Sequence, residues 1–472
     1  MKQSASFPAV VQRLLFEDLF EKPVALGMGP EPQSANAGLL LYGALDRRLG
    51  LTERVAGCLR EWRWAEEVRH ARVDLVRQRV FGLLGGYADG NDAARLRDEP
   101  TFRLLLERAL SDPEDALASQ PTLSRFENGL TRGSLMRWGR CLVDFVLGQQ
   151  RRRRKHVRRI TLDLDPTDDL AHGQQHFSFF NTHYGGRCFL PLLAFATFHD
   201  RRNAEEPERY LLAALLRPGN AAATLGVFGL LERLVGALRK RFPEARVRVR
   251  LDGAYATPEV LGQLEELHVE YVVNLGKNSV LLGLAEPYLI EARLKATLSG
   301  RTEKVFGEFR YAAGTWAGRT RRVVLKAEVT VDPAAAEKGL RDNPRFVVTN
   351  LRSNPEHVYR EDYCPRGSAE QRIEELKNEL YLGRTSCTDF WANQARVLLA
   401  ATAYVLAQEL RTRAGGTAAG RWHLGTFRAR LIKVAALARE STRRWVFQIS
   451  RTAPDAVLLW RLAQRLGAVP SG

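Results

Sequence analysis

Apolar residues recur at helical spacing through the first 150 residues. Three long stretches show this pattern and end in glycine or a turn, at residues 37–59, 66–90 and 119–148. No alternation typical of strands interrupts them. We therefore expect residues 1–150 to form a helical N-terminal region. Within it, PTLSRFENGLTRGSLMRW (residues 121–138) fits either a helix-turn-helix or ordinary core helices.

From Ile160 onward the period of the apolar residues changes from helix to strand. In ITLDLD (residues 160–165) three apolar residues alternate with a threonine and two aspartates, and RVRVRLDG alternates apolar residues with arginines. Such alternation predicts strands that bury one face. Three strands, a helix, a strand, a helix and a strand follow in order, which indicates a layered α/β domain with a mixed sheet. The predicted strands lie within residues 160–165, 183–198, 209–216, 246–253 and 269–276, and the helices within 221–242 and 257–268.

The rest of the chain divides by pattern into three further parts. Residues 279–360 contain alternating, basic stretches such as RTRRVVLKAEVTV, so we expect a β-rich insertion between the first part of the core (151–278) and its completion. Residues 361–412 are helical again and complete the core. Residues 413–472 form a predicted basic helical C-terminal region, joined through RAGGTAAGR, which has the composition of a flexible linker.

The amino-acid composition indicates the kind of partner and the cellular compartment. The formal net charge is +17 and the pI is about 10.0, which favours a polyanion, most often nucleic acid, although a general preference for arginine would raise the charge too. The run RRRRKHVRR (residues 151–159) is either a solvated linker or a phosphate-contacting segment, with Arg153 and Arg154 as candidates for DNA contact. Five scattered cysteines support neither a disulfide framework nor a zinc site, and they fit a reducing cytoplasm. We expect no signal peptide, no membrane span and a cytoplasmic, nucleoid-associated protein.

Two aspartates lie where functional groups collect in open α/β sheets. Asp165 ends the first predicted strand and Asp252 ends the fourth. Each alone also fits a turn. If the two strands are parallel neighbours, the carboxylates come together and repel each other, and a bound divalent cation relieves that repulsion. Mg²⁺ prefers such hard oxygen ligands.

A third carboxylate lies in YCPRGSAEQRIEELK (residues 363–377). We expect a helix to begin near Ala369, with Glu370 beside the apolar stripe that packs on the sheet. Lys377 lies only about 20° from Glu370 around the helix axis. Tyr363 and Arg366 precede the helix and can reach the same place. Alone, Glu370 also fits an acid favoured by the helix dipole. Together, these residues predict an acidic metal site whose cationic and aromatic neighbours hold phosphate.

At these residues the chain resembles a large branch of bacterial insertion-sequence DDE transposases. Tyr363, Arg366, Glu370 and Lys377 match the signature Y-x2-R-x3-E-x6-K that surrounds the catalytic glutamate in that branch. LDLDPTDDLAHGQQ resembles the segment with the first catalytic aspartate, in which Asp165 fits best and Asp163 is the close rival. VRLDGAYATPEVL resembles the second, with Asp252 in place. The resemblance covers about residues 65–472.

The resemblance implies a fold, a reaction and partners. It implies a ribonuclease-H-like mixed-sheet core with a β-rich insertion, flanked by helical N- and C-terminal regions. Asp165, Asp252 and Glu370 would bind two Mg²⁺ ions, with Mn²⁺ able to substitute. The protein would bind the terminal inverted repeats of an insertion sequence as double-stranded DNA, cut the element ends and join their 3′-hydroxyls to target DNA, as a homodimer in the synaptic complex. The N-terminal region would contact the repeats, with Tyr363, Arg366 and Lys377 on the phosphates.

Several alternatives remain open at this point. A ribonuclease-H-like, structure-selective endonuclease would share the core, and a domesticated, non-catalytic DNA-binding protein would share the fold. A metal-dependent phosphatase also clusters aspartates, but the strong positive charge does not suit one. Trp316 in the insertion either stacks on a displaced base or packs as an ordinary strand aromatic.

Overall fold

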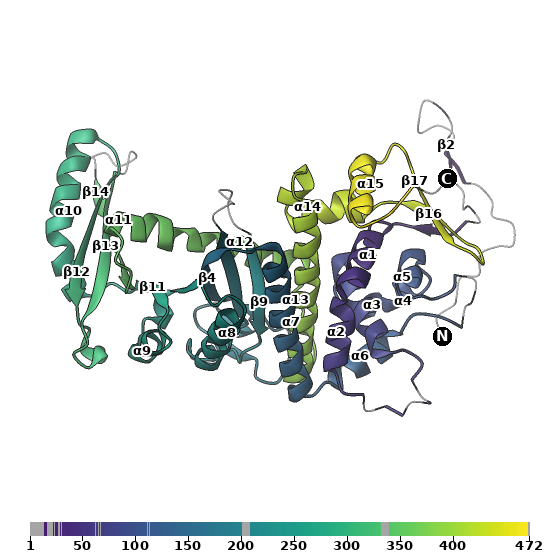
Figure 1. Cartoon of the computed structure of the whole chain (residues 1–472), viewed down its shortest axis with the longest axis horizontal. Coiled ribbons are helices and arrows are strands. Elements are labelled where there is room, and N and C mark those ends of the chain that lie inside the picture. The colour runs from purple at the N-terminus through teal and green to yellow at the C-terminus, as the bar shows by residue number, and fades with distance from the viewer. Residues whose placement is uncertain are drawn as a thin grey trace.

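The computed structural model has an elongated shape, with the core strands between the insertion at one end and the two terminal regions at the other (Figure 1). It describes nearly the whole chain, and no helix among the described residues is long and apolar enough to cross a membrane. Most of the first thirty residues, where we predicted no signal peptide, lie outside the described part. The described residues are 14–16, 22, 24–26, 29, 31–61, 63–64, 66, 68–110, 112, 114–200, 208–331 and 339–470.

One mixed sheet runs from the centre of the molecule into the insertion at one end. Its strands run in the order β12-β13-β15-β11-β10-β4-β8-β9, with β14 paired to β13. The three strands β4, β10 and β11 are parallel, whereas β8 and β9 are antiparallel to their neighbours. The core strands and helices follow one another along the chain in the predicted order, but the strand predicted within residues 183–198 is two strands, and the first of them, β7 (Gly186–Phe189), belongs to a separate small sheet with β5 (Asp169–Leu170) and β6 (Phe179–Asn181). The core strands are β4 (Val157–Pro166), β8 (Leu192–Asp200), β9 (Arg209–Leu215), β10 (Arg246–Leu251) and β11 (Glu270–Leu275).

Both faces of strand β4 are buried, the apolar one and the acidic one. Ile160, Leu162 and Leu164 are fully buried in the main apolar core, as the pattern predicts. Asp163 and Asp165, on the opposite face, are also buried rather than exposed to water. A polar face inside the protein needs polar partners, and here arginines supply them.

Helices cover the sheet on both sides. Two helices connect core strands along the chain and were predicted from their apolar spacing: α8 (Val227–Arg241) follows β9, and α9 (Pro258–Glu266) follows β10. The long helices α7 (Arg132–Arg153) and α13 (Phe390–Arg413) pack against each other and against β9. A hydrogen bond from the buried Trp138 indole to the Thr402 hydroxyl, 3.0 Å long, joins these two helices.

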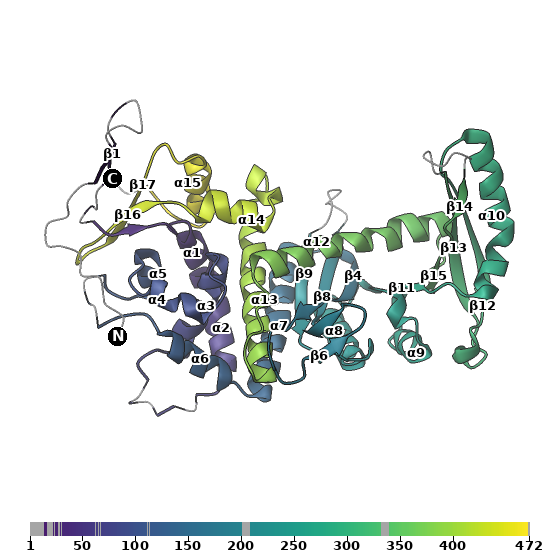
Figure 2. The ribbon, with the colours of Figure 1, turned by 180° about the vertical axis from the view of Figure 1, so that it is seen from behind.

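A continuous helical run carries the residues of the signature. It passes from the insertion to α13 along the molecule (Figure 2). The prediction that this helix begins near Ala369 is wrong, because helical structure starts at Pro355 and continues to Glu379 through changes of hydrogen-bond pattern. We call residues 355–379 the signature helix. Its segments are α11 (Pro355–His357), a π stretch (Val358–Tyr363), a 3₁₀ stretch (Cys364–Gly367), α12 (Ser368–Glu374) and a second π stretch (Glu375–Glu379).

The insertion contains a long helix as well as strands. Helix α10 (Ser279–Ser299) was missed, because its sequence contains Pro287 and apolar residues occur all around it, which hides the helical period. The strands of the insertion extend the central sheet beyond β11. They are β12 (Glu303–Tyr311), β13 (Arg321–Val331), β14 (Leu340–Asp342) and β15 (Arg345–Thr349).

The two terminal regions lie together at the other end of the molecule (Figure 1). The C-terminal region is not purely helical, because it holds two paired strands, one of which also pairs with a short N-terminal strand. Ala414 and Ala419 are buried, so the predicted linker is a compact turn. Besides β1 (Leu14–Phe16) and β2 (Val24–Leu26), the elements here are β3 (Gln33–Ser34), α1 (Leu39–Leu49), α2 (Leu51–Cys58), α3 (Arg72–Leu84), α4 (Ala93–Leu96), α5 (Pro100–Leu105), α6 (Gln120–Asn128), α14 (Leu424–Phe427), β16 (Ala436–Glu440), β17 (Trp445–Ile449) and α15 (Ala456–Arg465).

A buried carboxylate joins the signature helix to α13. Glu375 is 1% exposed and accepts hydrogen bonds from both Nη atoms of Arg411, at 2.9 and 3.0 Å, from the Tyr404 hydroxyl and from the backbone N–H of Leu424. Burial alone would raise the pKa of Glu375, but Arg411 and Arg372 outweigh it and hold this pKa at about 2.

We predict that Glu375→Gln destabilises the fold by about 3–5 kcal/mol, because it leaves Arg411 buried without its counter-charge. Urea unfolding at neutral pH measures the loss. The exposed neighbour Glu374→Gln is the control and should change stability little. The folded pKa of Glu375 lies below its unfolded value, so its contribution is complete above about pH 4.5 and fades as the pH falls towards about 2. Equal stability of the two variants would contradict this role.

Candidate active site at the ends of strands β4 and β10

The two predicted aspartates meet at the same edge of the sheet. Strands β4 and β10 are parallel neighbours, and Asp163 lies opposite Arg250 in their register. Asp165 and Asp252 each lie two residues further along, and both strands end there. The sheet therefore brings the two carboxylates side by side, as the sequence predicts.

Arg366 of the signature helix lies between these carboxylates. One of its Nη atoms binds Asp165 Oδ1, and the other is 3.9 Å from Asp252 Oδ1. Arg366 is half-buried and is held in part by Tyr363, whose side chain contacts it. A guanidinium thus provides the positive charge that two neighbouring carboxylates need.

The two aspartates differ in their surroundings. Asp165 is 6% exposed, and burial raises its pKa to about 6, with the charges of Asp163 and Asp252 adding to the rise and Arg366 opposing it. Its Oδ2 atom is buried and has no hydrogen-bond partner among the described residues. The Asp252 side chain is 45% exposed and accepts a hydrogen bond from the backbone N–H of Gly253. Asp165 therefore offers a buried oxygen with free acceptor capacity beside a solvent-accessible carboxylate.

Glu370 is not joined to this pair. It lies four residues after Arg366 in the signature helix and is exposed, and no described hydrogen bond or ion pair links it to either aspartate. Within the described ranges, no group of three or more acidic, histidine or cysteine side chains is arranged to hold a metal ion. The expected three-acid cluster is thus not assembled here; two acids and an arginine are.

The other signature residues lie on the same helix, with separate partners. Lys377 binds Asp168 just beyond β4, with its Nζ 2.7 Å from Oδ1. Tyr363 is half-buried beside Tyr359, and burial raises the pKa of its hydroxyl. The Lys377 contact ties one end of the signature to the loop after β4, and at the other end Tyr363 packs against an apolar cluster that includes Val324 and Val347 of the insertion.

A family comparison decides how this site is read. Residues 16–471 match the family model described as "Transposase DDE domain group 1". The chain belongs to this family of DDE transposases. A comparison with curated proteins gives no match. The matched range covers the helical ends as well as the sheet, so both belong to the matched family region.

Asp163, the rival candidate for the first catalytic acid, is held in a buried ion pair that stabilises the fold. It is fully buried, and Arg250 binds it with two hydrogen bonds of 2.6 and 2.7 Å, while Arg209 lies 3.6 Å away. Arg250 also donates to the backbone carbonyl of Asp362 in the signature helix. Both oxygens of Asp163 are therefore occupied, whereas Asp165 keeps one free.

Sequence reasoning missed these anchoring arginines as functional parts. Arg248 and Arg250 alternate along β10 with their side chains on the face that the acidic residues of β4 occupy. Arg248 binds Glu270 and Asp362 on that face. A signal for these arginines was present in the sequence. Strand β4 carries acids and strand β10 carries arginines at every second position, so on neighbouring strands the two sets would face each other.

Three other candidates lie away from the aspartates. Trp316 is 2% exposed, with the Arg321 guanidinium 4.9 Å from its ring centroid, which favours the packed alternative; stacking of Trp316 on a displaced base stays a prediction. The basic run is not a linker, since α7 ends at Arg153 and β4 begins at Val157. Arg153 pairs with Glu409, and Arg154 binds Gln150. Contact of Arg153 and Arg154 with DNA remains a prediction.

The helix-turn-helix alternative also has a structural answer. Helices α6 and α7 are joined by a short turn, but α7 packs on α13, α8 and β9 and buries Trp138 completely. An ordinary core helix therefore accounts for this stretch.

We predict that replacing each aspartate of β4 by asparagine has a different effect on stability. Asp163→Asn leaves Arg250 buried with its charge unbalanced and should cost about 3–5 kcal/mol of unfolding free energy. Asp165→Asn should change stability much less, because burial and two neighbouring carboxylates already disfavour its charged form and offset the ion pair with Arg366. Chemical unfolding of both variants tests this, and a larger loss for Asp165→Asn would contradict the assignment.

Proposed function

We propose that this chain binds the terminal inverted repeats of an insertion sequence, cuts the element ends by metal-dependent hydrolysis of phosphodiester bonds, and joins the 3′-hydroxyl ends to target DNA. The observation that carries the proposal is the pair Asp165 and Asp252, placed at adjacent strand ends beneath the signature arginine of a family member. The net charge of +17 supports DNA as the partner. We further propose a homodimer for synapsis of two ends, in the bacterial cytoplasm and associated with the nucleoid.

The residues present suit a divalent cation in part. The unpartnered Oδ2 of Asp165 and the accessible carboxylate of Asp252 are hard oxygen donors, while Glu370 is exposed and free to join them. We propose that these three residues hold Mg²⁺, or Mn²⁺ in its place, as two ions. Bound there, such ions activate water or a 3′-hydroxyl and stabilise the charge that develops on the phosphate.

The signature cations would serve the DNA. Arg366 lies between the aspartates, and we propose that its guanidinium moves away when both carboxylates bind the ions. A phosphate of the bound strand is a suitable new partner, because guanidinium binds phosphate through two parallel hydrogen bonds. Lys377 and Tyr363 flank the same place and would bind neighbouring phosphates. In this proposal Arg366 keeps two like charges together until DNA arrives.

The alternatives differ in their products. A structure-selective endonuclease would cut DNA without joining it to a target, and a domesticated DNA-binding protein would do neither. Incubation with Mg²⁺, DNA bearing the element ends and a target plasmid separates the three, because only a transposase gives joined products.

We predict that Glu370→Gln abolishes cleavage of end-bearing DNA while leaving DNA affinity within about twofold of the wild type, since one exposed carboxylate far outnumbered by cations contributes little to binding. Cleavage is read on gels and affinity by mobility shift. Glu374→Gln, four residues further along the same helix and equally exposed, is the matched control and should cut normally. Retained cleavage by Glu370→Gln would refute this assignment.

A further inference from the structure

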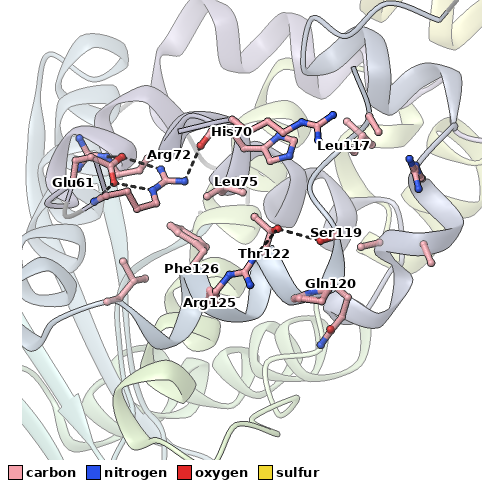
Figure 3. Close-up of a pocket in the computed structure, with 18 of the residues that line it drawn as sticks. Glu61, His70, Arg72, Leu75, Leu117, Ser119, Gln120, Thr122, Arg125 and Phe126 are labelled. Carbon is pink, nitrogen blue, oxygen red and sulfur yellow. Dashed lines mark hydrogen bonds and ion pairs between the residues drawn. The ribbon is translucent and has the colours of Figure 1, made fainter. Parts of the chain in front are cut away.

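A cavity of about 850 Å³ opens in the N-terminal helical region, away from the aspartates (Figure 3). It is formed by the loop between α2 and α3, the start of α3, helix α4 and helix α6. Figure 3 shows Glu61 and His70 on one side, Thr122 and Arg125 of α6 on the other, and Leu75 between them. The cavity is large enough for a nucleotide-sized ligand.

The lining of this cavity joins an apolar floor to a cationic rim. Leu75, Leu117 and Phe126 form apolar surface and are themselves buried. Among the described residues of the lining, one glutamate, Glu61, faces six arginines. The arginines are Arg60, Arg63, Arg69, Arg72, Arg97 and Arg125.

Only part of this positive charge is balanced. Glu61 forms ion pairs with Arg63 and Arg72, in which its Oε2 atom lies 2.8 Å from Arg63 Nη2 and 3.2 Å from Arg72 Nε. A buried Nη1 atom of Arg72 has no hydrogen-bond partner among the described residues. Arg97 and Arg125 are exposed and have no ion pair within the described ranges. The rim therefore carries several guanidinium groups available to an anion.

Two helices add to the positive potential. Both α3, which starts at Arg72, and α6, which starts at Gln120, present their N-terminal turns to the cavity. Neither first turn is capped by a hydrogen bond from its N-cap side chain. The N-terminus of a helix carries a partial positive charge and favours phosphate.

We propose that this cavity binds a nucleotide unit, with the base on the apolar floor and the phosphate among Arg97, Arg125 and Arg72. Arginine matches the geometry of phosphate, and apolar surface suits the faces of a base. The nucleotide belongs either to a DNA strand or to a free nucleotide. The strand case rests on the proposed function, whereas the free-nucleotide case does not.

The test measures binding in EDTA, where no metal-dependent cleavage occurs. The probes are a 5′-phosphorylated, fluorescently labelled single-stranded oligonucleotide, followed by anisotropy, and dAMP and ATP as competitors. The variant Arg97→Glu/Arg125→Glu should weaken binding of at least one probe by about tenfold or more, because it replaces charge-assisted contacts with repulsion. Competition by dAMP or ATP would identify a free nucleotide, and binding of the oligonucleotide alone would identify a strand.

Two further variants separate a pocket from general attraction to positive charge. Arg54→Glu/Arg95→Glu changes the net charge equally at exposed arginines of α2 and α4 that do not line the cavity, and binding should fall by less than about twofold. Ala94→Trp fills the cavity without changing charge and should weaken binding as the first variant does. All variants are checked for unchanged thermal unfolding.

Two results would overturn the proposal. These are an equal loss in the control pair, or full binding by Ala94→Trp. Failure of the proposed function would appear separately, as cleavage that survives replacement of the acids, and would not change binding in EDTA.

Discussion

Buried pairs of arginine and carboxylate hold the signature helix on the polar face of the sheet. Arg248 binds Asp362, and Arg250 binds both Asp163 and the backbone of the same helix. At the far end Arg411 binds Glu375. An unpaired buried charge costs several kcal/mol, so any slip of the helix would be penalised at each pair. The register of the helix on the sheet, and with it the position of Arg366, follows from this constraint.

The core strands could be predicted because their alternation is local. ITLDLD and RVRVRLD each show their period within a few residues, and the structure places them as parallel neighbours. The start of the signature helix could not be predicted, since Pro365 lies inside it and helical hydrogen bonding continues around it through 3₁₀ and π turns. Helix α10 escaped because it is apolar on its outer face too, where Leu294 and Leu298 are exposed.

In the candidate site, too, one part could be predicted from the sequence and another could not. The meeting of Asp165 and Asp252 follows from strand ends and could be predicted from the sequence. The guanidinium between them could not, because it depends on how the helix crosses the sheet. Glu370 lies one turn beyond that arginine and outside the pair, so the site is preassembled around a cation of the protein. We infer that binding of DNA and metal exchanges this internal cation for external ones.

Binding of Mn²⁺ to the DNA-bound protein, followed by electron paramagnetic resonance, tests this account most directly. The account predicts that Mn²⁺ binds to the wild-type complex and that binding is lost when Asp165 and Asp252 are both replaced by asparagine in a protein that still folds and still binds DNA. Unchanged Mn²⁺ binding by that double variant would show that the two aspartates are not the centre of the site.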